Sequence, residues 1–109
     1  MRSEELKAAK TESQFRDVNE RIAESAERVG ADEVALVCEC HDPECGTQID
    51  VTVEDYEDTR ADGARFLLAP GHERPDLERV LRTRPGYRVV EKQKAVGDVA
   101  RRLSPRPTE

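Results

Sequence analysis

"EVALVCECHDPECGTQIDVTV", residues 33–53, joins two apolar runs through a polar turn. The first run is rich in Val and Leu and predicts a strand from Glu33 to about Cys40. The second run, residues 47–53, alternates apolar and polar side chains, which is typical of a half-buried strand. Between them, residues 41–46 contain an Asp-Pro pair that favours a turn and a Gly that can take a positive φ. We therefore expect a β-hairpin whose strands flank a cysteine-rich loop.

All cysteines of the chain, Cys38, Cys40 and Cys45, fall within this hairpin. Side chains alternate along a strand, so Cys38 and Cys40 point to one side while Glu39 points to the other. The turn brings Cys45 back toward the same point. Three cysteines cannot form a complete set of disulfides within one chain, whereas clustered thiolates bind zinc in tetrahedral sites. The spacing therefore predicts a Zn²⁺ site with three thiolate ligands, with iron as the alternative metal.

A tetrahedral zinc site needs a fourth ligand, and the chain has two histidines. His41 lies in the cysteine loop, where a site built from residues 38–45 alone would be cramped. His72 follows a Pro-Gly turn at the end of the next predicted strand and reaches the cluster if that strand lies beside the hairpin. We prefer a Cys3His site made of Cys38, Cys40, Cys45 and His72, and the spacing leaves His41 as the alternative.

Residues 3–29 predict one long helix, followed by Gly30, a residue type that commonly closes helices. Its apolar residues step by three and four, which indicates one buried face; they are Phe15, Val18, Ile22, Ala26 and Val29. Residues 1–10 lack such a stripe, which favours fraying. We expect the helix to cover one face of the sheet with its apolar stripe.

The rest of the chain supplies further short elements. Thr52 begins a T-x-x-D pattern that resembles a capping box and starts a short helix closed by Gly63. In chain order there follow a strand over 64–70, a helix from Pro75 or Asp76 to about Thr83, a strand over 87–92, and a weakly amphipathic tail from Gln93 that ends in a disordered segment. The predicted fold is α+β: a long N-terminal helix packed on a small, mainly antiparallel sheet of three or four strands, with one or two short helices. Residues 1–92 are expected to form a single zinc-binding domain, with residues 93–109 as its tail.

The net charge of −6 is unevenly distributed, with −8 in residues 38–62 and +5 in residues 63–109. An acidic chain disfavours nucleic acid as a partner, because phosphate contacts require surplus Lys and Arg. We interpret the basic third as pairing with the acidic middle within the molecule. No stretch approaches the roughly 20 apolar residues of a membrane span, and the N-terminus lacks the apolar core of a secretory signal. We therefore expect a cytoplasmic location and no membrane partner.

Several segments resemble a family of small cytosolic proteins from high-GC Gram-positive bacteria. The similar pieces span most of residues 14–92 and are FRDVNERI, CEC with the following Cys45, EDYEDTRAD, RFLLAPGHE and YRVVEK. In this family the cysteine triplet occurs together with the histidine of the PGHE sequence. The resemblance therefore implies that His72 is the fourth ligand, and it implies no particular activity.

These observations predict a small non-enzymatic protein in which zinc shapes the fold and the surface acts as a protein-interaction or regulatory module. We expect the partner to be a second copy of the chain or a larger cytosolic complex, contacted through the long helix and the tail. Two alternatives use the same residues: a redox- or zinc-responsive thiol switch, and a zinc-dependent hydrolase. Acidic neighbours of the thiols disfavour the switch, and four good ligands disfavour the hydrolase because a catalytic zinc keeps an open position.

Overall fold

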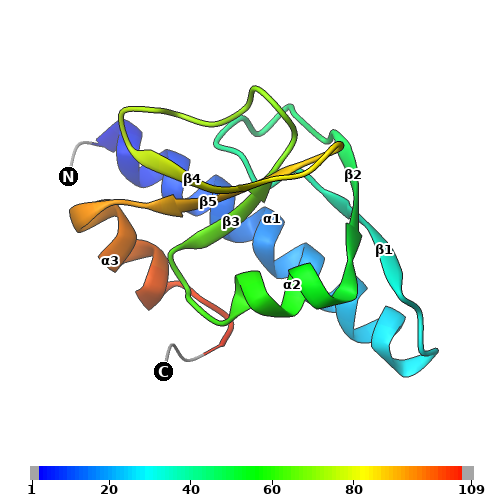
Figure 1. Cartoon of the computed structure of the whole chain (residues 1–109). Coiled ribbons are helices and arrows are strands. Elements are labelled where there is room, and N and C mark those ends of the chain that lie inside the picture. Colours follow the sequence, from blue (N-terminus) through cyan, green and yellow to red (C-terminus); the bar gives the residue numbers. More distant parts are fainter. Residues whose placement is uncertain (1–2, 107–109) are drawn as a thin grey trace.

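The computed structural model describes residues 3–106, which contain three helices and five strands (Figure 1). In chain order these are α1 (Ser3–Arg28), β1 (Glu33–Val37), β2 (Gln48–Thr52), α2 (Val53–Arg60), β3 (Arg65–Leu68), β4 (Glu78–Thr83), β5 (Arg88–Lys92) and α3 (Lys94–Arg102). The predicted α+β class, with a long N-terminal helix and antiparallel strands, is confirmed. None of the described helices is long and apolar enough to cross a membrane.

The strands form two small antiparallel sheets, β1-β2 and β3-β5-β4, where the sequence predicts one. The predicted hairpin is confirmed, with Val34 paired to Val51 and Leu36 paired to Ile49. These four side chains are buried, while the residues between them are exposed. The alternation of apolar and polar residues therefore places one face of the hairpin in the core.

The two sheets meet where the chain leaves β1. The Cys38 N–H still donates to the Thr47 carbonyl oxygen of the hairpin at 2.8 Å, whereas the Glu39 N–H donates to Leu67 of β3, also at 2.8 Å. The chain thus passes from one sheet to the other within two residues. For this reason β1 is shorter than the predicted strand, which extends to Cys40.

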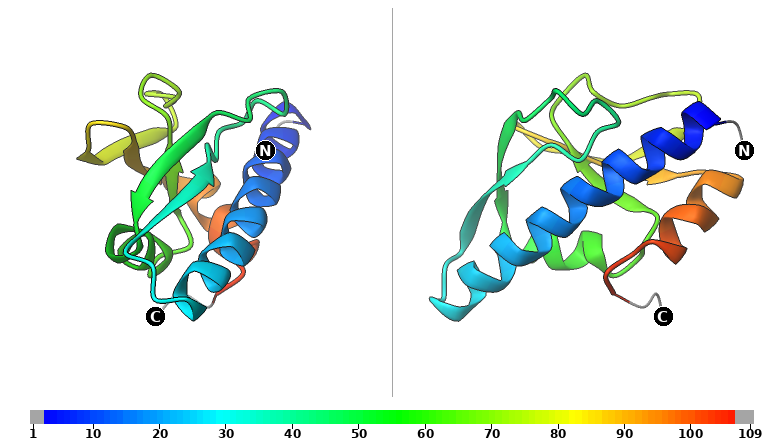
Figure 2. Two further views of the ribbon diagram at one scale, coloured as in Figure 1. Left: turned by 90° about the vertical axis from the view of Figure 1, so that its right-hand side faces the viewer. Right: turned by 180° about the vertical axis from the view of Figure 1, so that it is seen from behind.

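Helix α1 runs along one side of the molecule and lies nearest the viewer in the right-hand view of Figure 2, in front of the second sheet and beside the hairpin. The predicted helix is confirmed, but the predicted buried face is only partly right. Ile22 and Ala26 pack against the core, whereas Val18 is 44% exposed and Val29, directly after the helix, is 80% exposed. The buried face instead consists mostly of polar residues, namely Glu12, Arg16, Asn19, Glu20 and Ala23. Phe15 and Ile22 lie at its margin and are half-buried.

Hydrogen bonds explain this orientation of α1. Arg16 donates to the carbonyl oxygens of Gly63 and Ala100 at 2.6 and 2.9 Å, and its guanidinium lies over the Phe66 ring. A buried guanidinium needs such partners, so the helix face that supplies them is fixed in the interior. Residues 3–10, where the sequence favours fraying, are helical, and residues 1–2 lie outside the described part of the chain.

Residues 78–83 form strand β4, so the helix predicted over 75–83 is wrong. The apolar residues there are spaced as on a helix face, but β4 pairs with β5 across a bulge at Leu81. Lys92 of β5 also forms a buried ion pair with Glu78 of β4. Cross-strand pairing and this ion pair outweigh a weak local preference for helix.

The chain after β5 is folded up to residue 106. Helix α3 packs so closely on the end of β5 that a Cβ atom on Gly97 would lie 2.6 Å from the Lys92 carbonyl oxygen. Arg106 forms ion pairs with Glu20 of α1 and Glu57 of α2. Instead of the predicted tail, the structure has a packed helix and an anchored end, and residues 107–109 of the predicted disordered segment lie outside the described part.

Charged side chains pair across the molecule, as we expect from the uneven distribution of charge. Asp55 of α2 accepts hydrogen bonds from Arg82 and Arg84 at 2.6 and 2.9 Å. Arg101 of α3 pairs with Asp62 at 3.0 Å. The basic C-terminal third therefore neutralises part of the acidic middle within the chain.

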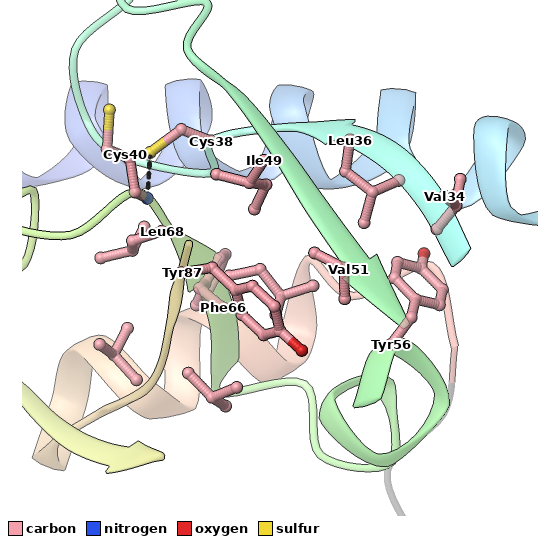
Figure 3. Packing of buried hydrophobic residues seen from close by; sticks show 14 of the residues in the cluster. Val34, Leu36, Cys38, Cys40, Ile49, Val51, Tyr56, Phe66, Leu68 and Tyr87 are labelled. Atoms are coloured by element: carbon pink, nitrogen blue, oxygen red, sulfur yellow. Dashed lines mark hydrogen bonds between the residues drawn. The ribbon is translucent and has the colours of Figure 1, made fainter. Parts of the chain in front are cut away.

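The hairpin, α2 and the second sheet enclose one hydrophobic core (Figure 3). Val51, Tyr56 and Phe66 are each at most 2% exposed at its centre. Cys38 and Cys40 lie at one end of this core. The thiols therefore mark the boundary between the core and the loop that joins the hairpin strands.

Candidate metal centre

The structure brings together the four side chains that the sequence selects as ligands. The sulfur atoms of Cys38, Cys40 and Cys45 and one ring nitrogen of His72 all lie within 4.8 Å of one another. His41, the alternative fourth ligand, is exposed in the loop and does not belong to this group. Three thiols and an imidazole at such distances can hold a metal ion.

The imidazole of His72 faces two of the sulfurs at the same distance. Its Nδ1 atom lies 3.5 Å from the Sγ atom of Cys38 and 3.5 Å from that of Cys45. A zinc tetrahedron with Zn–S near 2.3 Å and Zn–N near 2.0–2.1 Å has an S···N edge of about 3.5 Å. A neutral imidazole nitrogen needs only one hydrogen-bond partner. Two sulfur atoms at the same distance from that nitrogen are better explained by one ion that all three atoms share.

Two tight turns bring these ligands together from separate parts of the chain. In the hairpin loop, the Cys45 N–H donates to the Asp42 carbonyl oxygen at 3.1 Å, and Gly46 takes the expected positive φ of 67°. After β3, Gly71 has a φ of 85°, and the His72 N–H donates to Ala69 at 3.1 Å. Both glycine conformations are ones that L side chains rarely adopt, so each turn depends on its glycine.

Two of the sulfur atoms have a group within reach that can donate a hydrogen bond to a thiolate. The Ala69 N–H donates to the Cys38 sulfur at 3.1 Å, an interaction drawn as the dashed line in Figure 3. The Cys45 sulfur lies 3.3 Å from the hydroxyl oxygen of Thr47. Donors of this kind stabilise a thiolate, which is the form of cysteine that binds metals.

The thiols differ in their proton affinity because they differ in burial and in hydrogen bonding. Burial raises the pKa values of Cys38 and Cys40, which are 0% and 3% exposed. For Cys45, burial also acts to raise the pKa, but hydrogen bonds from Thr47 outweigh it and lower the pKa to about 7. The two buried thiols therefore need a cation beside them to become thiolates at neutral pH.

Glu39 points from the same segment to the opposite side, into the protein. One of its carboxylate oxygens accepts from the Leu67 N–H at 2.9 Å and from Arg60, and the other accepts from Asn19 at 2.8 Å. The alternation along the chain predicts this direction but not these partners. The Asn19 side chain also donates to the Val37 carbonyl oxygen and accepts from the Val37 N–H, at the edge of β1 that no other strand within residues 3–106 covers.

Sequence reasoning therefore missed the residues that position the metal segment. Asn19 and Arg60 lie in helices and gave no signal in the sequence, because polar residues in helices usually face solvent. Asn19 lies on the same face of α1 as Arg16 and Ala23. Its burial could have been predicted only if this face of the helix had first been identified as the buried one. No protein-family model, no curated protein and no solved structure matches the chain.

Proposed function

We propose that Cys38, Cys40, Cys45 and His72 hold one structural zinc ion in a small, non-enzymatic cytosolic protein that acts as a protein-interaction or regulatory module. The observation that carries this proposal is the convergence of four donors from two separate segments on one point. A metal there links the hairpin loop to the turn after β3 and so crosslinks the two sheets. A domain this small gains stability from such a link, because its core is limited.

The donor set favours zinc over an iron–sulfur cluster. Iron–sulfur clusters distribute their ligands around two or more irons, whereas these donor atoms lie within 4.8 Å of one another. Three thiolates and an imidazole in a compact group suit one tetrahedral ion of intermediate softness. Zinc is the metal that proteins most commonly hold with such ligands.

The same geometry favours a structural role over a catalytic one. Four protein ligands complete a zinc tetrahedron and leave no position for a water or a substrate. Glu73, the carboxylate next to His72, accepts a hydrogen bond from the Gly71 N–H at 2.9 Å within its own turn. A thiol switch is disfavoured because reactive thiols are exposed, and of these three cysteines only Cys45 is partly accessible.

An interaction role is supported by apolar side chains on the outer side of α1. Leu6 and Val18 are both 44% exposed, and Val29 is 80% exposed. The tail, which the sequence predicts to share in binding, folds as helix α3 and is packed against the body of the protein. Helix α1 is therefore the better candidate surface. The partner in this proposal is a second copy of the chain or a larger cytosolic complex.

Zinc analysis combined with two histidine variants tests the proposal. Purified protein that has met no chelator should contain one zinc per chain by elemental analysis. His72→Ala should release zinc to a colorimetric chelator far faster than His41→Ala, because His72 supplies a ligand from a second segment and His41 lies in the exposed loop. His41→Ala is thus the matched control for loss of an imidazole.

Two results would contradict the proposal. A negligible zinc content would remove the metal altogether. Equal release from the two variants, or faster release from His41→Ala, would show that the ligand set is different.

A further inference from the structure

A groove runs between the N-terminal half of α1 and the loop that carries the thiols. It has a volume of about 640 Å³ and is lined on one side by residues of α1 that include Lys7 and Lys10. His41 and Pro43 of the metal loop form the opposite wall, and Arg74 lies at the same groove. One wall is therefore a regular helix and the other is a loop whose shape depends on the metal ligands on either side of it.

The groove is positively charged in a protein that is negative overall. Lys7, Lys10 and Arg74 contribute three cationic groups, against one carboxylate from Glu4. Within residues 3–106 none of these three cations forms an ion pair, although most other arginines of the C-terminal half do. The net charge of the whole chain is −6. Unpaired cations gathered on an otherwise acidic surface form a complementary site for carboxylates.

The walls between these charges are largely apolar. Ala8 and Pro43 contribute apolar atoms, and the methylene stems of the lysines add to them. Its lining contains no Phe, Tyr or Trp, and the single His41 ring is a poor substitute for the row of large aromatic side chains on which proteins stack single-stranded nucleic acid. The combination of apolar walls and cationic rims fits an extended peptide with alternating apolar and acidic side chains.

We propose that this groove binds an acidic, extended segment of a partner protein, with its carboxylates at Lys7, Lys10 and Arg74. The inference rests on the proposed function, because zinc would fix the loop that forms one wall. By linkage, zinc and the peptide then each strengthen the binding of the other. Zinc thereby acts on recognition as well as on folding.

An unbiased peptide library displayed on phage tests the proposal, with the zinc-loaded full-length protein as bait. Selected peptides should be enriched in Asp and Glu together with Leu, Ile or Val. A synthetic peptide from the selected pool should bind the variant Lys7→Glu/Lys10→Glu about tenfold more weakly than the natural sequence in fluorescence anisotropy. The matched control is Arg21→Glu/Arg28→Glu, which makes the same charge change at exposed positions farther along the same helix and should bind normally.

Each other outcome has a definite meaning. A pool without acidic enrichment, or equal binding by the two charge-reversal variants, would overturn the proposal. Self-association in sedimentation that only Lys7→Glu/Lys10→Glu abolishes would replace the acidic partner with a second copy of the chain. Zinc content is measured on the same preparations, so zinc-loaded protein that selects no acidic peptide contradicts this inference alone, whereas protein without zinc contradicts the proposed function.

Discussion

The two sides of residues 38–40 are held in different ways. On one side, Cys38 and Cys40 direct their sulfurs to the candidate metal centre. On the other, Glu39 is 0% exposed and is bound by Arg60, Asn19 and the Leu67 N–H. The first side offers four donor atoms that could hold an added ion, whereas on the second side both carboxylate oxygens of Glu39 have partners within the chain.

One short segment can therefore take part in two kinds of crosslink. The Glu39 side joins α1, α2 and β3 permanently, and the cysteine side joins the hairpin loop to the turn after β3 when a metal is present. Because consecutive residues point in opposite directions, neither set of partners interferes with the other. The inner network holds the backbone on which the outer ligands depend.

Removal of the Glu39 side chain should have the largest effect on the free energy of unfolding. Glu39→Ala leaves the buried guanidinium of Arg60 without its carboxylate partner. Two nitrogens of this guanidinium, Nε and Nη1, have no hydrogen-bond partner among the described residues even before the substitution. We expect a loss of about 4–5 kcal/mol in the free energy of unfolding, measured by urea denaturation of the zinc-loaded protein. The control Glu33→Ala, at an exposed position of β1 in the chain segment that leads to Glu39, should change it by less than about 0.5 kcal/mol. A loss for Glu39→Ala as small as that of the control would refute the importance of the inner network.

Removal of zinc from the cysteine side should have a somewhat smaller and more local effect on stability. A chelator at neutral pH should lower the free energy of unfolding by about 4 kcal/mol relative to protein in free zinc at a thousand times the Kd. Amide hydrogen exchange should quicken in residues 40–47 and 69–73, while the Leu67 amide, which Glu39 holds, stays protected. Uniformly faster exchange over the whole chain would mean that the inner network cannot hold the segment alone.

The buried carboxylate of Asp55 provides a third, weaker case. The hydrogen bond from Arg84, aided by Tyr87 and Arg82, lowers the pKa of Asp55 to about 2 although burial opposes this. The unfolded carboxyl group titrates near 3.9, so this stabilisation is full above about pH 5 and is lost as the pH falls toward 2. Asp55→Asn should therefore cost about 2 kcal/mol at pH 7 and progressively less as the pH is lowered to 3. A difference between the two proteins that does not change with pH would exclude this ionic contribution.

The hairpin and the clustering of Cys38, Cys40 and Cys45 were predictable because their signals are local, whereas the spacing left His41 and His72 both open as the fourth ligand and only the family resemblance favoured His72. Val and Ile alternate with polar residues along β2, and the clustered cysteines restrict what the loop can do. The buried face of α1 was not predictable, since Val18 of the helix and Val29 directly after it are exposed while Arg16 and Asn19 are buried. Their partners are up to 84 residues away in the chain, so no local pattern reveals them.

Strand β4 could not be predicted for a related reason. Its sequence, ERVLRT, has the apolar spacing of a helix as well as a composition that a strand tolerates. The choice is made by pairing with β5 and by the ion pair between Glu78 and Lys92, both of which depend on tertiary structure. Where local preferences are nearly balanced, the long-range contact decides.

Cys45 and His72 are separated by 27 residues, so a ribosome makes the three thiol ligands before the imidazole. The three thiols emerge together on one hairpin, and a short loop closes quickly. The imidazole follows later, and the strand before it, β3, gains its neighbour β5 only after residues 88–92 have been made. An ion captured early would be held by sulfur alone, and the nitrogen ligand would join it only once β3 had paired with β5. The complete ligand set would then mark the assembly of the second sheet.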